Sequence, residues 1–99
     1  MSELKILVEY SVKENKLNDF LTEIKNNKIR EKVFEEKGCI SYDYFLPEDT
    51  TQNKLVLMEK WQSKDLQQLH LTTPHMQTFS TIKEKYVDDT NVTFWIIND

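Results

Sequence analysis

Several residue types that would mark a class of protein at once are scarce in this chain. Its 99 residues include one cysteine, one glycine and two prolines. A lone cysteine, Cys39, cannot form an internal disulfide, and a lone glycine, Gly38, leaves no room for a glycine-rich phosphate-binding loop. No apolar run approaches the roughly 18 residues that a membrane-spanning helix needs. We therefore expect no disulfide scaffold, no glycine-rich nucleotide site and no membrane span.

The chain also lacks an excess of positive charge. The chain has 13 Lys and Arg against 17 Asp and Glu, a net charge of −4, and its basic residues are spread along the sequence. Nucleic acids and anionic membrane surfaces both attract clustered positive charge. We therefore expect neither a nucleic-acid partner nor a membrane partner.

What remains is the composition of an ordinary globular protein. Hydrophobic residues make up 38% of the chain and charged residues 30%. This length supports one modest core, so we expect a single domain over residues 1–99. From Leu4 onward apolar and polar residues alternate, and no signal-peptide core is present. We therefore expect a cytoplasmic protein.

The spacing of apolar residues predicts an α+β domain. Strand patterns cover residues 4–12, 39–46, 54–61 and 91–97, and helical patterns cover residues 17–36, 63–70 and 74–87. The last two helical stretches follow one another, so the order is β-α-β-β-α-β. This is the order of a ferredoxin-like split-βαβ fold, in which a four-stranded antiparallel sheet carries its helices on one face.

Polar residues are expected to begin, bend or end these helices. Ser63 and Thr73 are expected N-caps, and the proline after Thr73 suits the first position of a new helix. The helical pattern drifts at residues 26–27, where we expect the first helix to bend. Residues 88–89, both aspartates, are expected to end the last helix.

The third and fourth predicted strands are apolar on both faces. Residues 55–58 and 92–97 lack the alternation expected of an antiparallel sheet with one face in water. Something must therefore cover the second face. In a chain this short we predict that a second copy covers it, giving a homodimer packed sheet against sheet.

The two histidines of the chain are the candidates for acid–base chemistry near neutral pH. His70 lies four residues after Leu66 and should share its inward face, where a structural core histidine is the commoner interpretation. His75 lies near the positive end of the helix that begins at Pro74, which disfavours the imidazolium. A surface histidine is the alternative there. Their i, i+5 spacing and the lack of a Cys or Asp/Glu cluster beside them predict no metal site, and we expect no cofactor.

Three residues near the histidines are candidates for a binding pocket. Trp61 ends the third predicted strand, and Glu59 points to the same face two residues earlier. A carboxylate among apolar neighbours needs a partner, either in a polar cavity or across a dimer. Tyr42 is an ordinary strand residue that would offer a hydroxyl group if it lined a cavity.

Three stretches of the sequence form a recognisable set. They are a glycine turn into a Tyr-bearing strand (38–42), a Glu-x-Trp strand end (57–66) and the pattern His-x-x-Thr-Pro-His-x-x-x-Phe (70–79). Together, and over nearly the whole chain from Leu4 to Ile97, they resemble the antibiotic biosynthesis monooxygenase family. The resemblance implies a dimeric α/β barrel of ferredoxin-like subunits, each with a pocket between sheet and helices. It also implies one of three activities: cofactor-free oxidation of phenols or quinols with O₂, isomerisation of quorum signals, or haem degradation.

Departures of this sequence from the patterns of two branches of the family reduce the number of activities to consider. The haem-degrading branch has an Asn on the first strand, a Trp on the helix after the third strand and a later His. This chain has no Asn on the first strand and has His70 and Ser80 at the other two positions. The signal-processing branch carries a further histidine near the end of the first helix, where residues 27–29 of this chain contain none. Haem degradation is therefore disfavoured, and the likeness to signal processing is weakened.

The leading hypothesis is an oxidoreductase, a cofactor-independent monooxygenase that oxidises a small electron-rich aromatic of the quinol or phenol type with O₂. The resemblance makes His70 the first candidate for the base and His75 the second, because a neutral histidine has a pKa near the working pH. Trp61 and Tyr42 would form the pocket walls, and Glu59 would orient a histidine. The alternatives are an isomerase of a small phosphorylated or carbonyl signal metabolite and a non-catalytic small-molecule-binding dimer.

Overall fold

The computed structural model describes residues 3–49 and 51–97. Its elements are β1 (Glu3–Val12), α1 (Leu17–Asn26), α2 (Ile29–Phe34), β2 (Cys39–Phe45), β3 (Lys54–Trp61), α3 (Lys64–His70), α4 (Pro74–Tyr86) and β4 (Val87–Ile97). In the described part of the chain, no helix combines the length and the apolar character needed to cross a membrane.

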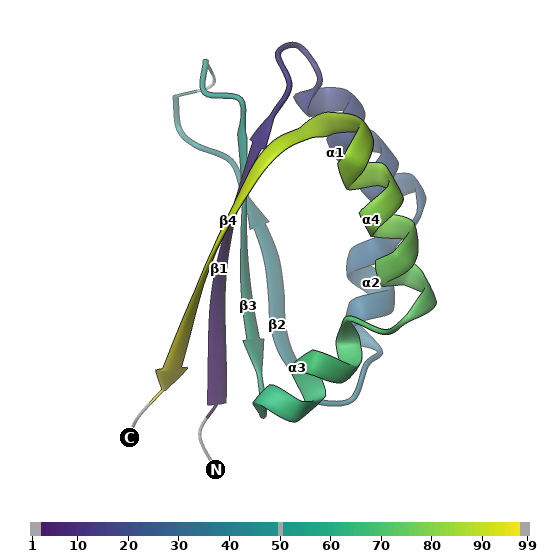
Figure 1. Cartoon of the computed structure of the whole chain (residues 1–99), viewed down its shortest axis with the longest axis vertical. Helices are drawn as coiled ribbons and strands as arrows, with labels where there is room; N and C mark the ends of the chain where they lie inside the picture. Colours follow the sequence, from purple (N-terminus) through teal and green to yellow (C-terminus); the bar gives the residue numbers. More distant parts are fainter. Residues whose placement is uncertain (1–2, 50, 98–99) are drawn as a thin grey trace.

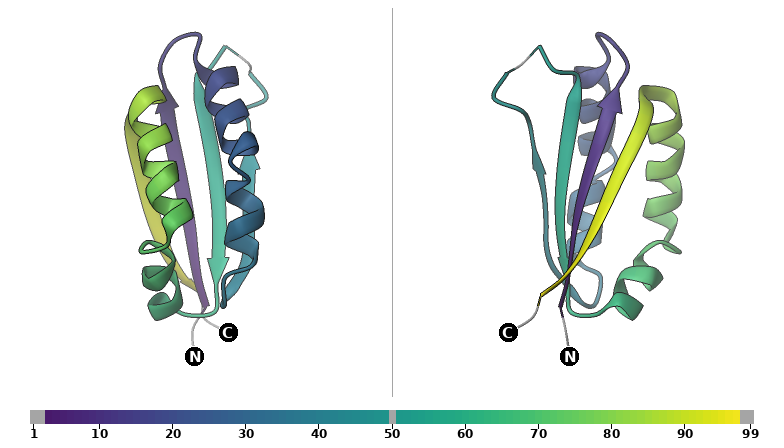
Figure 2. Two further views of the ribbon diagram at one scale, coloured as in Figure 1. Left: turned by 90° about the vertical axis from the view of Figure 1, so that its right-hand side faces the viewer. Right: turned by 60° about the vertical axis from the view of Figure 1, so that its left-hand side comes forward.

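The strands form one antiparallel sheet in the order β2-β3-β1-β4. Helices α1, α2 and α4 lie along one face of this sheet, and the short α3 closes its lower end (Figure 1). The two side views show α4 beside the paired helices α1 and α2, all on the same face (Figure 2). The α+β, ferredoxin-like prediction is therefore confirmed.

Local signals placed the starts of α3 and α4 and the bend in the first helix correctly; Asn15, which also has a cap-forming side chain, does not cap α1, whose N-cap is Lys16 without a side-chain hydrogen bond. Ser63 Oγ accepts a hydrogen bond from the Leu66 amide, and Thr73 Oγ1 accepts one from the Met76 amide. The predicted first helix is broken into α1 and α2 because Lys28 adopts a left-handed conformation, with φ of 53°. The break lets α2 turn its own apolar side toward the sheet.

The predicted end of the last helix was wrong. Asp88 and Asp89 lie inside β4, which begins at Val87, directly after α4. Pairing with β1 causes this extension, because Val12 lies opposite Val87 and Ser11 lies opposite Asp89 across a register shift. Both aspartates are exposed, so this edge-strand position does not bury their charge.

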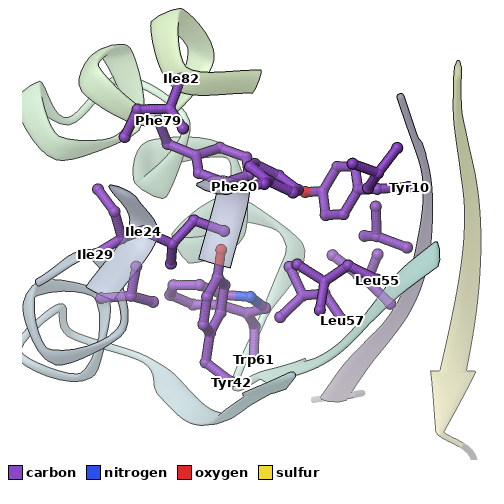
Figure 3. Close-up of a cluster of buried hydrophobic side chains, with 14 of the residues drawn as sticks. Tyr10, Phe20, Ile24, Ile29, Tyr42, Leu55, Leu57, Trp61, Phe79 and Ile82 are labelled. Carbon is purple, nitrogen blue, oxygen red and sulfur yellow. The ribbon is translucent and has the colours of Figure 1, made fainter. Parts of the chain in front are cut away.

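An aromatic core cluster, Tyr10, Phe20, Phe79 and Tyr86, fills the upper part of the space between sheet and helices. The ring of Phe20 lies 5.9 Å from Tyr10, 6.2 Å from Phe79 and 6.0 Å from Tyr86, measured between centroids. Figure 3 shows Tyr10, Phe20 and Phe79 packed together, with Tyr42 and Trp61 side by side below them. Phe20 comes from α1 and Phe79 from α4, so the cluster joins both helices to β1.

Strand β4 is apolar on both faces, as the sequence predicted, and neither face is well covered. Its residues Val92 and Phe94 pair with the buried Val8 and Ile6 of β1, yet they are 43% and 55% exposed. On the opposite face of the sheet, Trp95 is 56% exposed. The helices cover β1, β2 and β3 more closely than β4, which leaves a cavity between β4 and α4.

Candidate functional site

A cavity of about 350 Å³ lies between the inner face of the sheet and helices α3 and α4. Most of its wall is apolar, but three buried polar residues, Glu59, Gln67 and His70, line one part of it. The full lining is Ile6, Val8, Tyr10, Tyr42, Glu59, Gln67, His70, Leu71, Met76, Phe79, Ser80, Lys83, Thr90, Val92 and Phe94. An apolar cavity with a few convergent polar groups is the usual form of a small-molecule site.

His70 lines this cavity from the end of α3. It is the last residue of α3, and its four-residue spacing from Leu66 turns it inward, so its side chain is 1% exposed. Its ring packs 4.7 Å from the Trp61 ring and 5.9 Å from the Tyr42 ring. Its Nδ1 atom lies 2.7 Å from Oε2 of Glu36, in the turn between α2 and β2. This buried position needs a polar partner, and Glu36 is that partner.

Glu36 joins the two histidines. The same oxygen that contacts His70 lies 2.8 Å from Nε2 of His75. A carboxylate oxygen only accepts hydrogen bonds, so both of these ring nitrogens carry a hydrogen when Glu36 is ionised. A neutral imidazole has one such hydrogen, and His70 therefore has a bare Nε2. We call Glu36, Glu59, His70 and His75 the histidine cluster.

Glu59 lies on the other side of His70. Its Oε1 accepts a hydrogen bond of 2.9 Å from Trp61 Nε1 and lies 4.0 Å from Nε2 of His70. Burial raises the pKa of Glu59 from 4.5 to about 7; the bond from Trp61 lowers it, and the charge of Glu36 raises it further. The bare nitrogen of His70 therefore faces a carboxyl group that exchanges its proton near neutral pH.

Burial also acts on His70 itself. It lowers the pKa of His70 from its ordinary 6.5, and the hydrogen bond with Glu36 offsets part of this effect. His70 is therefore neutral at pH 7, with Nε2 available to accept a proton. A base in this state beside a cavity can remove a proton from a bound hydroxyl or an activated carbon.

Two tyrosine hydroxyls of β2 are buried without a hydrogen-bond partner among the described residues, those of Tyr42 and Tyr44. The hydroxyl of Tyr42 points into the core above Trp61 (Figure 3). Burial raises the pKa of both phenols, so both stay protonated. Of these two tyrosines, Tyr42 lines the cavity and Tyr44 does not.

The five residues singled out in the sequence form one cluster but take different positions. His70, Glu59 and Tyr42 line the cavity. Trp61 is fully buried behind Glu59, and His75 contacts Glu36, so neither forms part of the lining. These two side chains hold the carboxylates on either side of His70.

Sequence reasoning missed two residues of this region, Glu36 and Lys83. Glu36 lies seven residues after Ile29 and three after Val33, both fully buried. That spacing would have placed it on the inward side of the helix predicted over residues 17–36, although its charged neighbours in the sequence resemble a surface turn. Lys83 lines the cavity from α4, and no motif or spacing in the sequence marks it as a pocket residue.

Comparison with known proteins identifies the family of this chain. The model of the antibiotic biosynthesis monooxygenase family matches residues 4–81. The chain therefore belongs to this family. YjcS of Bacillus subtilis (strain 168), an uncharacterized protein, is 28% identical over 64 residues. That match covers 65% of this chain and 58% of YjcS, so the chain spans little more than half of this curated relative.

Solved structures share the whole fold. PA3566 from Pseudomonas aeruginosa has a TM-score of 0.88 at 15% identity, covering 100% of this chain and 97% of its own. A structure described as an antibiotic biosynthesis monooxygenase has a TM-score of 0.78 at 18% identity, covering 97% of each chain. At these identities the likeness shows the fold, and the chemistry must be argued from the residues themselves.

Proposed function

We propose that this chain is a monooxygenase that oxidises a small electron-rich aromatic, of the quinol or phenol type, with O₂ and without a cofactor. One observation carries the proposal. His70 is buried and neutral, with Nδ1 bonded to Glu36 and Nε2 unbonded toward Glu59, which lines the same cavity. Membership of the monooxygenase family supports the reaction type, and the apolar wall suits an aromatic ring.

The reaction begins with proton removal. Nε2 of His70 takes the proton of a substrate hydroxyl, and Glu36 and Glu59 stabilise the imidazolium from either side. The quinolate then gives one electron to O₂, and the two radicals combine at a ring carbon that bears hydrogen. The resulting peroxide anion takes the proton back from His70 and becomes a hydroperoxide. The hydroperoxide then loses its terminal hydroxyl together with the hydrogen of the ring carbon as water, which leaves a new C=O group. The balance is quinol plus O₂ to hydroxyquinone plus water.

The other residues have supporting roles in this scheme. Tyr42 offers its unpartnered hydroxyl to a substrate oxygen. Trp61 holds Glu59 by the hydrogen bond from Nε1, and His75 holds Glu36. His75 is therefore a positioning residue in this proposal, and His70 is the base.

Oxygen uptake with a menadiol-type quinol tests the proposal. His70→Asn keeps a donor near Glu36 but removes Nε2, so its rate above autoxidation should fall about 10²- to 10⁴-fold, the usual contribution of a general base. His75→Gln keeps a donor for Glu36 and is the matched control, with a much smaller loss expected. Equal rates in wild type and His70→Asn would remove His70 from the mechanism.

A second function, isomerisation of a small phosphorylated or carbonyl compound, has one observation in its favour. Lys83 lines the cavity and could pair with an anionic group of such a substrate. This chemistry uses the same base but no O₂, so turnover that persists under anaerobic conditions would favour it. A ligand that binds equally to wild type and His70→Asn, with no turnover in either atmosphere, would instead indicate a non-catalytic binder.

We also propose that the chain forms a homodimer through its sheet. Apolar side chains are exposed on the face away from the helices, and this face has no cover within the described part of the chain: Phe45 is 47% exposed, Met58 37% and Trp95 56%. A second copy would cover them and add a wall near the exposed residues of β4. Size-exclusion chromatography with light scattering at micromolar concentration should give twice 11.9 kDa, and Trp95→Lys should shift the mass toward 11.9 kDa. A wild-type mass of 11.9 kDa would rule the dimer out.

A further inference from the structure

Three metal-binding atoms converge where three elements begin or end. Glu36 Oε2 lies 2.7 Å from His70 Nδ1 and 2.8 Å from His75 Nε2, and all three atoms lie within 4.8 Å of one another. His70 ends α3, and His75 lies in the first turn of α4. Bonds of about 2.0–2.2 Å from one ion to such atoms place neighbouring ligands roughly 3 Å apart. Small side-chain movements would therefore convert this hydrogen-bonded arrangement into a coordination site.

We propose that Glu36, His70 and His75 form a binding site for a divalent first-row transition cation, with Zn²⁺ as the ion to test first. Two imidazole nitrogens and one carboxylate oxygen are a common donor set for such ions, and they leave further positions for water. The sequence predicted no metal because the histidines are five residues apart with no acidic cluster nearby. Glu36 supplies the missing oxygen from 34 residues before His70.

The far side of His70 also suits metal binding. A metal-bound histidine usually donates its other ring N–H to a carboxylate or carbonyl group. Coordination through Nδ1 places the hydrogen of His70 on Nε2, which faces Oε1 of Glu59 at 4.0 Å, so a shift of about 1 Å would form this hydrogen bond. The opposite side gives an entry path, since the side chains of His75 and Glu36 are 14% and 13% exposed.

Metal binding and the proposed oxidation would exclude one another at His70. With the ion on Nδ1, the single hydrogen of the neutral ring moves to Nε2, and no atom is gained or lost. Nε2 then donates and cannot accept the substrate proton. The cation is thus expected to inhibit the metal-free reaction. This consequence rests on the proposed function, whereas binding of the cation does not.

Direct titration tests the site. The full-length chain, free of any histidine tag, is titrated with Zn²⁺ by calorimetry and with Co²⁺ by visible absorption. We expect one equivalent per chain and the absorption bands of a nitrogen- and oxygen-ligated Co²⁺. Loss of an outer partner of a metal ligand typically weakens affinity roughly 10- to 100-fold, and Glu36→Gln and His75→Ala should exceed this because they remove ligands.

Glu23→Gln is the matched control. Glu23 also receives two side-chain hydrogen bonds, from Lys85 and Tyr86, but has no histidine beside it. Its variant should bind both ions as the wild type does. Absence of saturable binding near one equivalent, or equal weakening in Glu23→Gln and Glu36→Gln, would overturn the proposal. Zn²⁺ should inhibit quinol oxidation by the wild type, and the same inhibition of His75→Ala should need a far higher Zn²⁺ concentration. If saturating Zn²⁺ binds to the wild type without inhibiting it, the mutual exclusion at His70 is refuted, whereas the metal site itself is not.

Discussion

Two groups of rings fill the space between the sheet and the helices, and they differ in the ionisable side chains that lie beside them. In the aromatic core cluster, Tyr10, Phe20 and Phe79 pack with centroids 5.8 to 6.2 Å apart. Around the histidine cluster, His70 packs just as closely, 4.7 Å from Trp61. There, however, two carboxyl groups lie beside the rings: Glu59 is buried, and the side chain of Glu36 is 13% exposed.

The second arrangement is costly if stability is its only purpose. Burying ionisable groups disfavours their charged forms, and apolar side chains of similar volume are often as stable or more stable. Burial is the largest cause both of the raised pKa of Glu59 and of the lowered pKa of His70. Strongly shifted groups beside a cavity are typical of functional sites. The comparison thus separates a region that stabilises the fold from one whose buried ionisable groups are typical of a functional site.

Removing a ring from the aromatic core cluster is expected to give the largest effect on stability. Phe20 is fully buried, and Phe20→Ala should lower the free energy of unfolding by about 3–5 kcal/mol because it leaves a cavity that the helices cannot close. Urea denaturation followed by circular dichroism measures this. His70→Asn serves as the contrast and should cost less than Phe20→Ala, because it keeps a donor near Glu36. If both variants lose the same stability, the two regions do not differ in the way proposed.

Glu59 should make the free energy of unfolding depend on pH. Its pKa rises from 4.5 to about 7 on folding, so the folded protein binds this proton more tightly than the unfolded chain. The free energy of unfolding should therefore fall as pH rises through this window, by a total of about 3 kcal/mol. Glu59→Gln keeps an acceptor for Trp61 but does not titrate. Its stability should lack this decline and exceed that of wild type at pH 8; a parallel decline in both proteins would contradict the assignment.

The fold could be predicted from the sequence because its signals are local. Alternation in β1 and the caps at Ser63 and Thr73 lie within a few residues of the elements they define. The start of β4 could not be predicted in the same way. Residues 88–89 have the composition of a turn, and only their pairing with β1 makes them a strand.

The candidate site likewise contains residues that local sequence patterns predict and residues that they do not. The spacing of His70 from Leu66 and of Glu59 from Trp61 is enough by itself to direct both side chains inward. Glu36 contacts His70 across 34 residues and His75 across 39, and no local pattern encodes those contacts. The tautomer of His70 depends on Glu36, so the chemistry of the site could not be derived without the fold.

Gly38 fixes the turn that brings Glu36 to the histidines, and its replacement should have a moderate effect. It adopts a left-handed conformation with φ of +93°, and an added Cβ would lie 2.8 Å from Cβ of Leu66. Because Leu66 belongs to α3, Gly38→Ala should push away the helix that carries His70. We expect a loss of about 1–3 kcal/mol in unfolding free energy and a lower oxidation rate. A variant with full activity and lower stability would show that the turn serves the fold alone.

Tyr42 and Tyr44 offer the smallest and most closely matched comparison. Both hydroxyls are buried and unpartnered among the described residues, so replacing either tyrosine by Phe removes the same unsatisfied group. Each variant should keep its stability or gain up to about 1 kcal/mol, because an unpaired buried hydroxyl costs free energy. Only Tyr42 lines the cavity, so only Tyr42→Phe should raise KM or lower kcat for the quinol. Equal kinetics in the two variants would mean that the hydroxyl of Tyr42 does not contact the substrate, and recognition of its polar atoms would then fall to other lining residues such as His70, Glu59 and Gln67.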